Sequence, residues 1–173
     1  MGYTLVLGGA RSGKSRYAQR EAEAAAKTSG QMPIAIVTAQ IFDEEMADRV
    51  AIHQADRGSA WCTVEAPVQL AKAIEELAQG GIAVIDCMTL WLTNVMLADM
   101  DITAETDTLI QALQRSPAQI WIVSNEVGWG IIPENALARR FRDEAGRLNQ
   151  RLAQSAEHAV LIVAGLKLDL TRT

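Results

Sequence analysis

The chain has 173 residues, of which 49% are hydrophobic, and a formal net charge of −5 at pH 7. This length supports one sizeable hydrophobic core, so we expect a single domain over residues 1–173, and the acidic balance argues against a nucleic-acid-binding protein. The sequence has no basic start and no long apolar run, which predicts a cytoplasmic protein without a signal peptide or a membrane span. Cys62 and Cys87 are far apart, which predicts two small buried residues rather than a disulfide or a zinc site.

Segments typical of strands and helices alternate along the chain. Short apolar runs predict buried strands, and apolar residues at helical spacing predict helices. Because the strands are continuous apolar runs separated by helices, we expect an α/β fold with a mostly parallel sheet and helices on both faces. The expected elements are a strand at 3–7, a helix at 14–26, a strand at 34–38, a helix at 43–55, an edge strand at 61–64, a helix at 68–79, a strand at 82–85, helices at 90–97 and 103–114, a strand at 120–123, a long helix with Pro133 in its first turn and Leu137, Phe141, Leu148 and Leu152 on one side, a strand at 159–164 and an edge strand at 166–170.

A phosphate-binding motif follows the first expected strand. Residues 8–15 read GGARSGKS and match the pattern G-x-x-x-x-G-K-[ST] between a strand and a helix. In such a loop the backbone N–H groups surround a phosphate, so Lys14 would reach the β- and γ-phosphates and the Ser15 hydroxyl would bind Mg²⁺. We therefore expect a nucleoside triphosphate site; the alternative is a chance match in a glycine-containing turn.

Polar residues also follow the other expected strands. In a parallel sheet the ligand lies beyond the carboxyl ends of the strands, which directs attention to residues 38–40, Asp86, Asn125 and Glu126. Asp86 is the candidate second ligand of Mg²⁺, and its alternative role is the N-cap of the next helix. Asn125 and Glu126 either orient an acceptor or a nucleotide, or form a capped loop that holds the turn to Pro133.

The chain has two histidines, His53 and His158. His158 precedes a strand, which favours a surface position. His53 lies on the expected helix at 43–55, and Arg49 and Arg57 are four residues before and after it, so the three share one face. Two cations beside an imidazole favour its neutral form and attract polyphosphate, which would make His53 a nucleophile. From this spacing alone, a solvated helix face with an uninvolved histidine is an equal alternative.

Four stretches of the chain together resemble one enzyme family. They read GGARSGKSRYA, TAQIFDEEMADRVAIHQADRGSAWCTVEAP, DCMTLWLTN and SNEVGWGIIPENALARRFRDEAGRLNQRLA. The chain resembles, over nearly its whole length, the bifunctional adenosylcobinamide kinases and adenosylcobinamide-phosphate guanylyltransferases of cobalamin biosynthesis. The resemblance implies phosphorylation of adenosylcobinamide by ATP or GTP, and then transfer of GMP from GTP through a guanylyl-histidine to give adenosyl-GDP-cobinamide. It also implies a RecA-like P-loop NTPase fold and a homotrimer with sites at the subunit edges.

The resemblance also implies which residues act. The guanylylated histidine of the family falls on His53, in the arrangement H-x-x-x-R that His53 and Arg57 form. With Mg²⁺ held by Ser15 and Asp86, the catalytic residues are then His53 and Lys14. The nucleotide-contacting positions fall on Gly8, Gly9, Ala10, Arg11, Ser12, Gly13, Lys14, Ser15, Thr38, Ala39, Gln40, Gln54, Ala55, Asp56, Arg57, Glu65 and Asp86. Two other functions stay open: a small-molecule kinase without guanylyl transfer, and a RecA-like binding protein that is switched by nucleotide hydrolysis.

Overall fold

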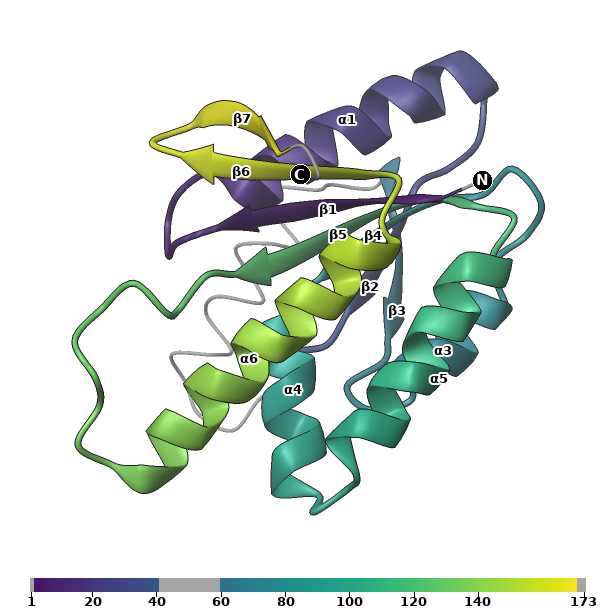
Figure 1. Ribbon diagram of the computed structural model, residues 1–173. Coiled ribbons are helices and arrows are strands. Elements are labelled where there is room, and N and C mark those ends of the chain that lie inside the picture. The colour runs from purple at the N-terminus through teal and green to yellow at the C-terminus, as the bar shows by residue number, and fades with distance from the viewer. Residues whose placement is uncertain (1, 41–59, 171–173) are drawn as a thin grey trace.

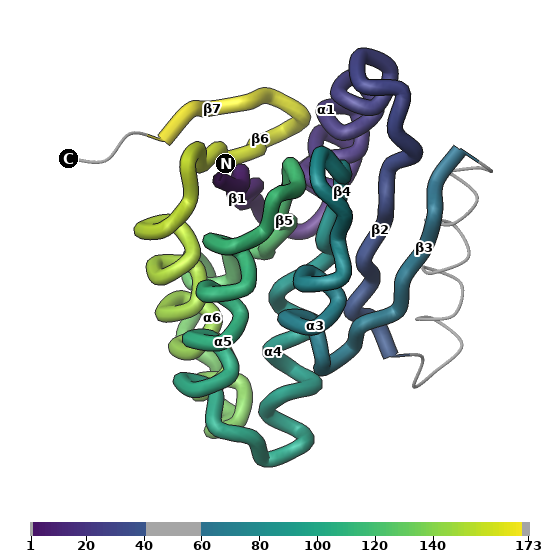
Figure 2. The backbone as a smooth tube through the Cα atoms, turned by 90° about the vertical axis from the view of Figure 1, so that its right-hand side faces the viewer, coloured from purple at the N-terminus to yellow at the C-terminus, as the bar shows by residue number. Residues whose placement is uncertain are grey.

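The computed structural model describes residues 2–40 and 60–170, and the structural statements below concern these residues. Their strands form one sheet with the order β3-β2-β4-β5-β1-β6-β7, and Figure 2 shows β3 and β7 at opposite edges. Neighbouring strands are parallel except for β6 and β7, which are antiparallel. The strands are β1 (Tyr3–Gly8), β2 (Ile34–Val37), β3 (Cys62–Glu65), β4 (Ile82–Asp86), β5 (Gln119–Asn125), β6 (His158–Val163) and β7 (Leu166–Leu170).

Helices cover both faces of the sheet. Figure 1 shows α1 on one face and the other labelled helices on the opposite face. They are α1 (Lys14–Ser29), α3 (Leu70–Glu75), α4 (Met88–Leu97), α5 (Ile102–Arg115) and α6 (Ala136–Ser155). The α/β fold with a mostly parallel, two-sided sheet is therefore confirmed. Among the described helices, none combines the length and the apolar character that a membrane crossing needs.

The two faces of the sheet are packed with different side chains. On the α1 face, Ala18, Ala22 and Ala26 recur every four residues, and all three are buried against the sheet. Alanines at this spacing form one narrow stripe along the helix, so the helix axis lies close to the strands. On the other face, larger side chains such as Trp91 and Leu152 are fully or almost fully buried between the helices and the sheet.

Two expected helices differ from the structure. The helix expected at 68–79 is only Leu70–Glu75, because the Leu77 N–H donates to the Ile74 carbonyl, three residues back, and tightens the last turn. The long helix does not have Pro133 in its first turn: it begins at Ala136, and the Asn135 side chain caps it by accepting from the Ala138 N–H at 3.1 Å.

The sequence analysis was also wrong about one residue of the long helix, Leu137, which it expected on the apolar side. Leu137 is 58% exposed, whereas Phe141 packs against the core and Leu148 and Leu152 are buried, so the first turn of α6 does not cover the core. The helix expected at 43–55 lies outside the described residues. The other expected elements are present, with bounds that differ by a few residues.

We predict that the buried pair Ser124 and Asn149 stabilises the fold as a unit. The Ser124 hydroxyl donates to Asn149 Oδ1 at 2.6 Å, and the Asn149 amide donates to the Asn125 carbonyl at 3.2 Å. Ser124→Ala or Asn149→Leu alone leaves a buried polar group unpaired and should cost about 1–3 kcal/mol. The double variant should cost clearly less than the sum, because both partners are gone.

Equilibrium unfolding in urea of the wild type, both single variants and the double variant measures this coupling. Additivity within about 0.5 kcal/mol would show that the two side chains stabilise the fold independently.

Candidate nucleotide site

One edge of the sheet gathers most of the described site residues. The strand register pairs Gly8 with Asn125, and it pairs Val37 with both Glu65 and Asp86. The carboxyl ends of β1, β2, β3, β4 and β5 therefore lie at the same end of the sheet. The phosphate loop, residues 38–40, Asp86 and Asn125 therefore lie at this end of the sheet.

The phosphate loop, residues 8–15, bends tightly over the end of β1. A side chain at position 8 would place its Cβ 2.4 Å from Ser12 Oγ and 2.6 Å from the Ile162 carbonyl oxygen, so only glycine fits. Gly13 has φ +97°, a left-handed conformation that favours glycine, and it is the N-cap residue of α1. Because Gly13 has no side chain, it leaves the first N–H groups of α1 free to bind an anion.

The turn between β6 and β7 supports the loop from behind. The Gly165 N–H donates to the Ser12 carbonyl at 2.8 Å, and the Cα of Gly165 lies 3.4 Å from where a Cβ on Gly13 would be. Ser12 Oγ is buried and has no hydrogen-bond partner among the described residues. The hairpin thus fixes the middle of the loop through its backbone.

Lys14 is held inside the site rather than in solvent. It is 7% exposed, and its Nζ donates to the Gly9 carbonyl at 3.0 Å. Burial lowers the pKa of Lys14, and the nearby Asp86 carboxylate partly opposes this shift. A buried cation with a single neutral acceptor can bind an incoming phosphate at little cost, because most of its hydration has already been lost.

Asp86 and Ser15 are the described oxygen donors beside the loop. Asp86 is half-buried at the end of β4, and the N-cap of α4 is Cys87, so the alternative role of Asp86 as the helix N-cap is wrong. Ser15 is half-buried in the first turn of α1. The described ranges contain no cluster of three or more His, Cys, Asp or Glu that could hold a metal ion. One carboxylate and one hydroxyl nevertheless fit Mg²⁺, which takes few protein ligands and shares phosphate oxygens.

The segment after β2 is buried against the segment after β4. Thr38 is fully buried; its hydroxyl donates to the Cys87 carbonyl at 2.7 Å and accepts from the Cys87 N–H at 2.9 Å. Ala39 and Gln40, the next two residues, are half-buried. Thr38 thus has no exposed surface with which to contact a nucleotide, and its hydroxyl is engaged in holding Cys87.

Asn125 and Glu126 lie beside the start of the loop. The Asn125 amide donates to the Thr89 hydroxyl at 2.6 Å, and the Glu126 N–H donates to the Gly8 carbonyl at 3.0 Å. The Glu126 carboxylate accepts from the Gly128 N–H at 2.6 Å, which is the geometry of a capped loop. Both side chains are half-buried, so they also border the space beyond the sheet.

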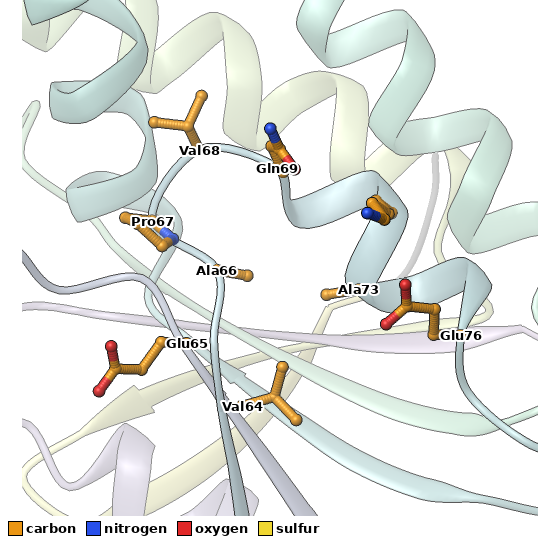
Figure 3. A pocket seen from close by; sticks show the side chains of 9 residues that line it. Val64, Glu65, Ala66, Pro67, Val68, Gln69, Ala73 and Glu76 are labelled. Atoms are coloured by element: carbon orange, nitrogen blue, oxygen red, sulfur yellow. The ribbon is translucent and has the colours of Figure 1, made fainter.

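Glu65 lines a separate cavity beside β3, at the edge of the sheet. The cavity has a volume of about 380 Å³, and Figure 3 shows Glu65 on its strand side, Pro67 and Val68 on the connecting turn, and Glu76 directly after α3. Its lining residues are Val64, Glu65, Ala66, Pro67, Val68, Gln69, Lys72, Ala73 and Glu76. The volume lies within the range of small-molecule pockets.

The expected nucleophile and its neighbours lie outside the described residues; they are Arg49, His53, Gln54, Ala55, Asp56 and Arg57. His158 is exposed at the start of β6, away from the carboxyl ends of the strands, as its surface interpretation predicts.

The sequence analysis missed three buried polar residues near the site: Thr89, Asn94 and Asn149. The signal for Asn94 was present, because it lies among mostly apolar residues in the stretch WLTNVML. A polar side chain in such a segment is buried only where its hydrogen bonds are satisfied.

We expect Lys14→Met to stabilise the ligand-free protein while it weakens triphosphate binding. Because the pKa of Lys14 is lowered on folding, the folded state carries a penalty at every pH below that lowered pKa, and the penalty disappears as the pH rises toward the ordinary value of 10.5. The gain in urea midpoint over wild type should therefore be full at pH 7 and smaller at pH 10. Triphosphate binding should weaken about 10- to 100-fold, the effect of losing a charged hydrogen bond.

Lys27→Met is the matched control, because Lys27 is exposed in the last turn of α1. It should bring no gain in stability. A urea midpoint for Lys14→Met below that of wild type at pH 7 would contradict the conclusion that burial of the Lys14 charge destabilises the folded protein.

Comparison with known proteins places the chain in a family. The family model described as "Cobinamide kinase / cobinamide phosphate guanyltransferase" matches residues 4–170. The "Bifunctional adenosylcobalamin biosynthesis protein CobP" of Pseudomonas aeruginosa is 44% identical over 169 residues, which cover 96% of this chain and 95% of that protein. The proteins named "Bifunctional adenosylcobalamin biosynthesis protein CobU" from Escherichia coli and Salmonella typhimurium are each 42% identical over 178 residues, with 94% of this chain and 96% of the relative covered. The chain therefore belongs to the cobinamide kinase / cobinamide phosphate guanyltransferase family.

Proposed function

We propose that this protein carries out two reactions in cobalamin biosynthesis. It phosphorylates adenosylcobinamide with ATP or GTP, and it then transfers GMP from GTP to the product, through a guanylyl group on His53, to give adenosyl-GDP-cobinamide. The observation that carries the proposal is a fully formed phosphate loop in a chain that matches the family from residue 4 to residue 170. The names of the relatives, which describe bifunctional proteins of adenosylcobalamin biosynthesis, agree with it.

In the kinase step the acceptor hydroxyl attacks the γ-phosphorus, and the bond from that phosphorus to the bridging oxygen of the nucleoside diphosphate breaks. The loop residues, Gly8 to Ser15, bind the phosphates through backbone N–H groups. Lys14 exchanges its bond to the Gly9 carbonyl for the β- and γ-phosphate oxygens. Positioning and charge neutralisation are sufficient for this chemistry.

Ser15 and Asp86 are the residues that would hold Mg²⁺. When bound, the ion neutralises negative charge on the β- and γ-phosphates. The contribution of the protein is to supply one hydroxyl and one carboxylate at the end of the sheet, next to the buried Lys14.

In the guanylyl step an imidazole nitrogen of His53 attacks the α-phosphorus of GTP, and pyrophosphate leaves. The phosphate of the acceptor then attacks the same phosphorus, the P–N bond breaks, and His53 is regenerated. Arg49 and Arg57 would stabilise the charge that develops, and Gln54, Ala55 and Asp56 would contact the nucleotide. This division into two displacements predicts ping-pong kinetics.

The Glu65 cavity is our candidate for the guanine site. A carboxylate can accept hydrogen bonds from both N1–H and the N2 amino group of guanine, whereas adenine offers no such pair of donors. Glu65 is exposed and lines a cavity of suitable volume. Selection of GTP over ATP would then depend on Glu65 in the guanylyl step.

Assembly as a cytoplasmic homotrimer completes the proposal. Several large apolar side chains are exposed on the described surface, among them Trp129 at 76%, Ile131 at 97% and Leu166 at 74%. Exposed apolar side chains of this size support a subunit interface.

We predict that wild-type protein mixed with Mg²⁺ and GTP labelled at the α-phosphate retains label after denaturation. The label should be lost in acid and resist alkali, as expected for a phosphorus–nitrogen bond, and it should be absent from His53→Ala. His158→Ala is the matched control and should keep the label, because His158 is exposed at the far edge of the sheet. If wild type binds GTP but retains no label, the covalent step is wrong, and a kinase without guanylyl transfer becomes the better interpretation.

We also predict that Glu65→Gln lowers selectivity for GTP. The KM for GTP in the guanylyl step should rise about 10-fold or more, since a hydrogen bond to a charged group contributes about 1.5–3 kcal/mol. The rate of ATP-driven phosphorylation should not change. Glu76→Gln removes a carboxylate from the other side of the same cavity and serves as the control. Equal effects of the two substitutions on the KM for GTP would argue against a specific guanine contact at Glu65.

A further inference from the structure

Helix α4 carries a buried amide in an apolar segment. Asn94 is 4% exposed, and its Nδ2 donates two hydrogen bonds of 2.8 Å each, one to the Thr38 carbonyl and one to the Pro67 carbonyl. An amide nitrogen has two protons, so both of its donors are used. Because a buried amide is costly unless it is bonded, these two contacts explain why an asparagine is tolerated among apolar neighbours.

The first contact leads to Asp86. Thr38 holds both backbone groups of Cys87, the residue after Asp86. The Thr38 hydroxyl accepts from the Cys87 N–H and donates to the Cys87 carbonyl. The Thr38 N–H also donates to the Asp86 carbonyl at 3.2 Å. Thr38 therefore fixes the backbone that carries Asp86, and Asn94 fixes Thr38.

The second contact leads to the Glu65 cavity. Pro67 lines that cavity two residues after Glu65. On the same helix, one turn before Asn94, the Trp91 indole N–H donates to the carbonyl of Val68, the next lining residue, at 3.0 Å. Two side chains of α4 thus hold the turn between β3 and α3.

We propose that Asn94 is a positioning residue that holds the Glu65 cavity and Asp86 at a fixed separation. Its planar amide joins the two carbonyls directly, so the end of β2 and the cavity wall cannot move apart without breaking one of the two bonds. The proposal rests on the proposed function for the use of Glu65 and Asp86 by the nucleotide. The link itself is a property of the protein without ligand.

The two cysteines provide a readout of this link that needs no nucleotide. Cys87 is buried and Cys62 is exposed. A thiol reagent such as 5,5′-dithiobis(2-nitrobenzoate) should label Cys62 quickly in every variant, which provides an internal reference. It should reach Cys87 only when the segment held by Thr38 opens or when the whole protein unfolds.

The test compares Asn94→Ala with Tyr3→Phe. Tyr3 is also buried, and its hydroxyl also donates to a backbone carbonyl, that of Leu152 at 2.7 Å, but it lies at the start of β1, away from the carboxyl ends of the strands. Urea unfolding of each variant gives the labelling rate of Cys87 that global unfolding alone would produce. We expect Asn94→Ala to label Cys87 at least tenfold faster than this rate, and Tyr3→Phe to match it. Cys87 labelling that follows global stability in both variants would overturn the proposal.

Activity gives the second readout. Asn94→Ala should raise the Mg²⁺ concentration for half-maximal phosphorylation about tenfold, and Tyr3→Phe should leave it unchanged. In an Asp86→Asn background, Asn94→Ala should cause no further change, because Asn94 acts through Asp86. An independent, additive effect in that background would contradict the proposed route. If wild type phosphorylates no cobinamide, the proposed function fails, while the thiol measurement still decides the role of Asn94.

If Asn94→Ala does not fold, Thr38→Val and Thr38→Ser test the next step of the link, from the Thr38 hydroxyl to Cys87, through which Asn94 would act on Asp86. Valine has the shape of threonine without the hydroxyl, whereas serine keeps the hydroxyl. Thr38→Val should expose Cys87 to the reagent and Thr38→Ser should restore its protection. Equal labelling of the two variants would refute the link.

Discussion

The close approach between the phosphate loop and its surroundings is the constraint on which the site depends. The chain must turn so sharply after β1 that position 8 has no room for a Cβ beside Ser12 Oγ and the Ile162 carbonyl. This turn aims the start of α1 at the space beyond the sheet and holds the Lys14 amine on the Gly9 carbonyl. Since β1 pairs with both β5 and β6, the position of the loop is fixed from two sides.

A network of side-chain hydrogen bonds lies beneath the polar residues at the carboxyl ends of the strands. Hydrogen bonds join the ends of β2, β4 and β5 to helices α4 and α6, and the side chains that form them are buried except for the half-buried Asn125. Such networks are costly when incomplete, and each donor described here has a close acceptor. The less buried residues at this end of the sheet are thus held in place by buried ones.

The sequence predicted the fold class and most elements, because strand and helix periods and the glycine motif act locally. It could not predict the early end of α3, where the Leu77 N–H bonds to a carbonyl three residues back, or the exposure of Leu137, which depends on how far the core extends beneath α6. The phosphate loop and Asp86 were accessible from local pattern, and the roles of Glu65 and His53 came from resemblance. The role of Asn94 was not accessible, because its two acceptors are 56 and 27 residues away in the chain.

The contact between Gly165 and Ser12 makes the end of the chain part of the phosphate loop's support. The N–H of Gly165, in the turn that leads into β7, holds the loop, although the turn contains none of the motif residues. Shortening the chain before this turn would free the loop without removing a single motif residue. A tag or fusion partner attached after β7 would leave this contact intact, because Leu170 pairs with Ala159 at the end of the hairpin opposite to the turn.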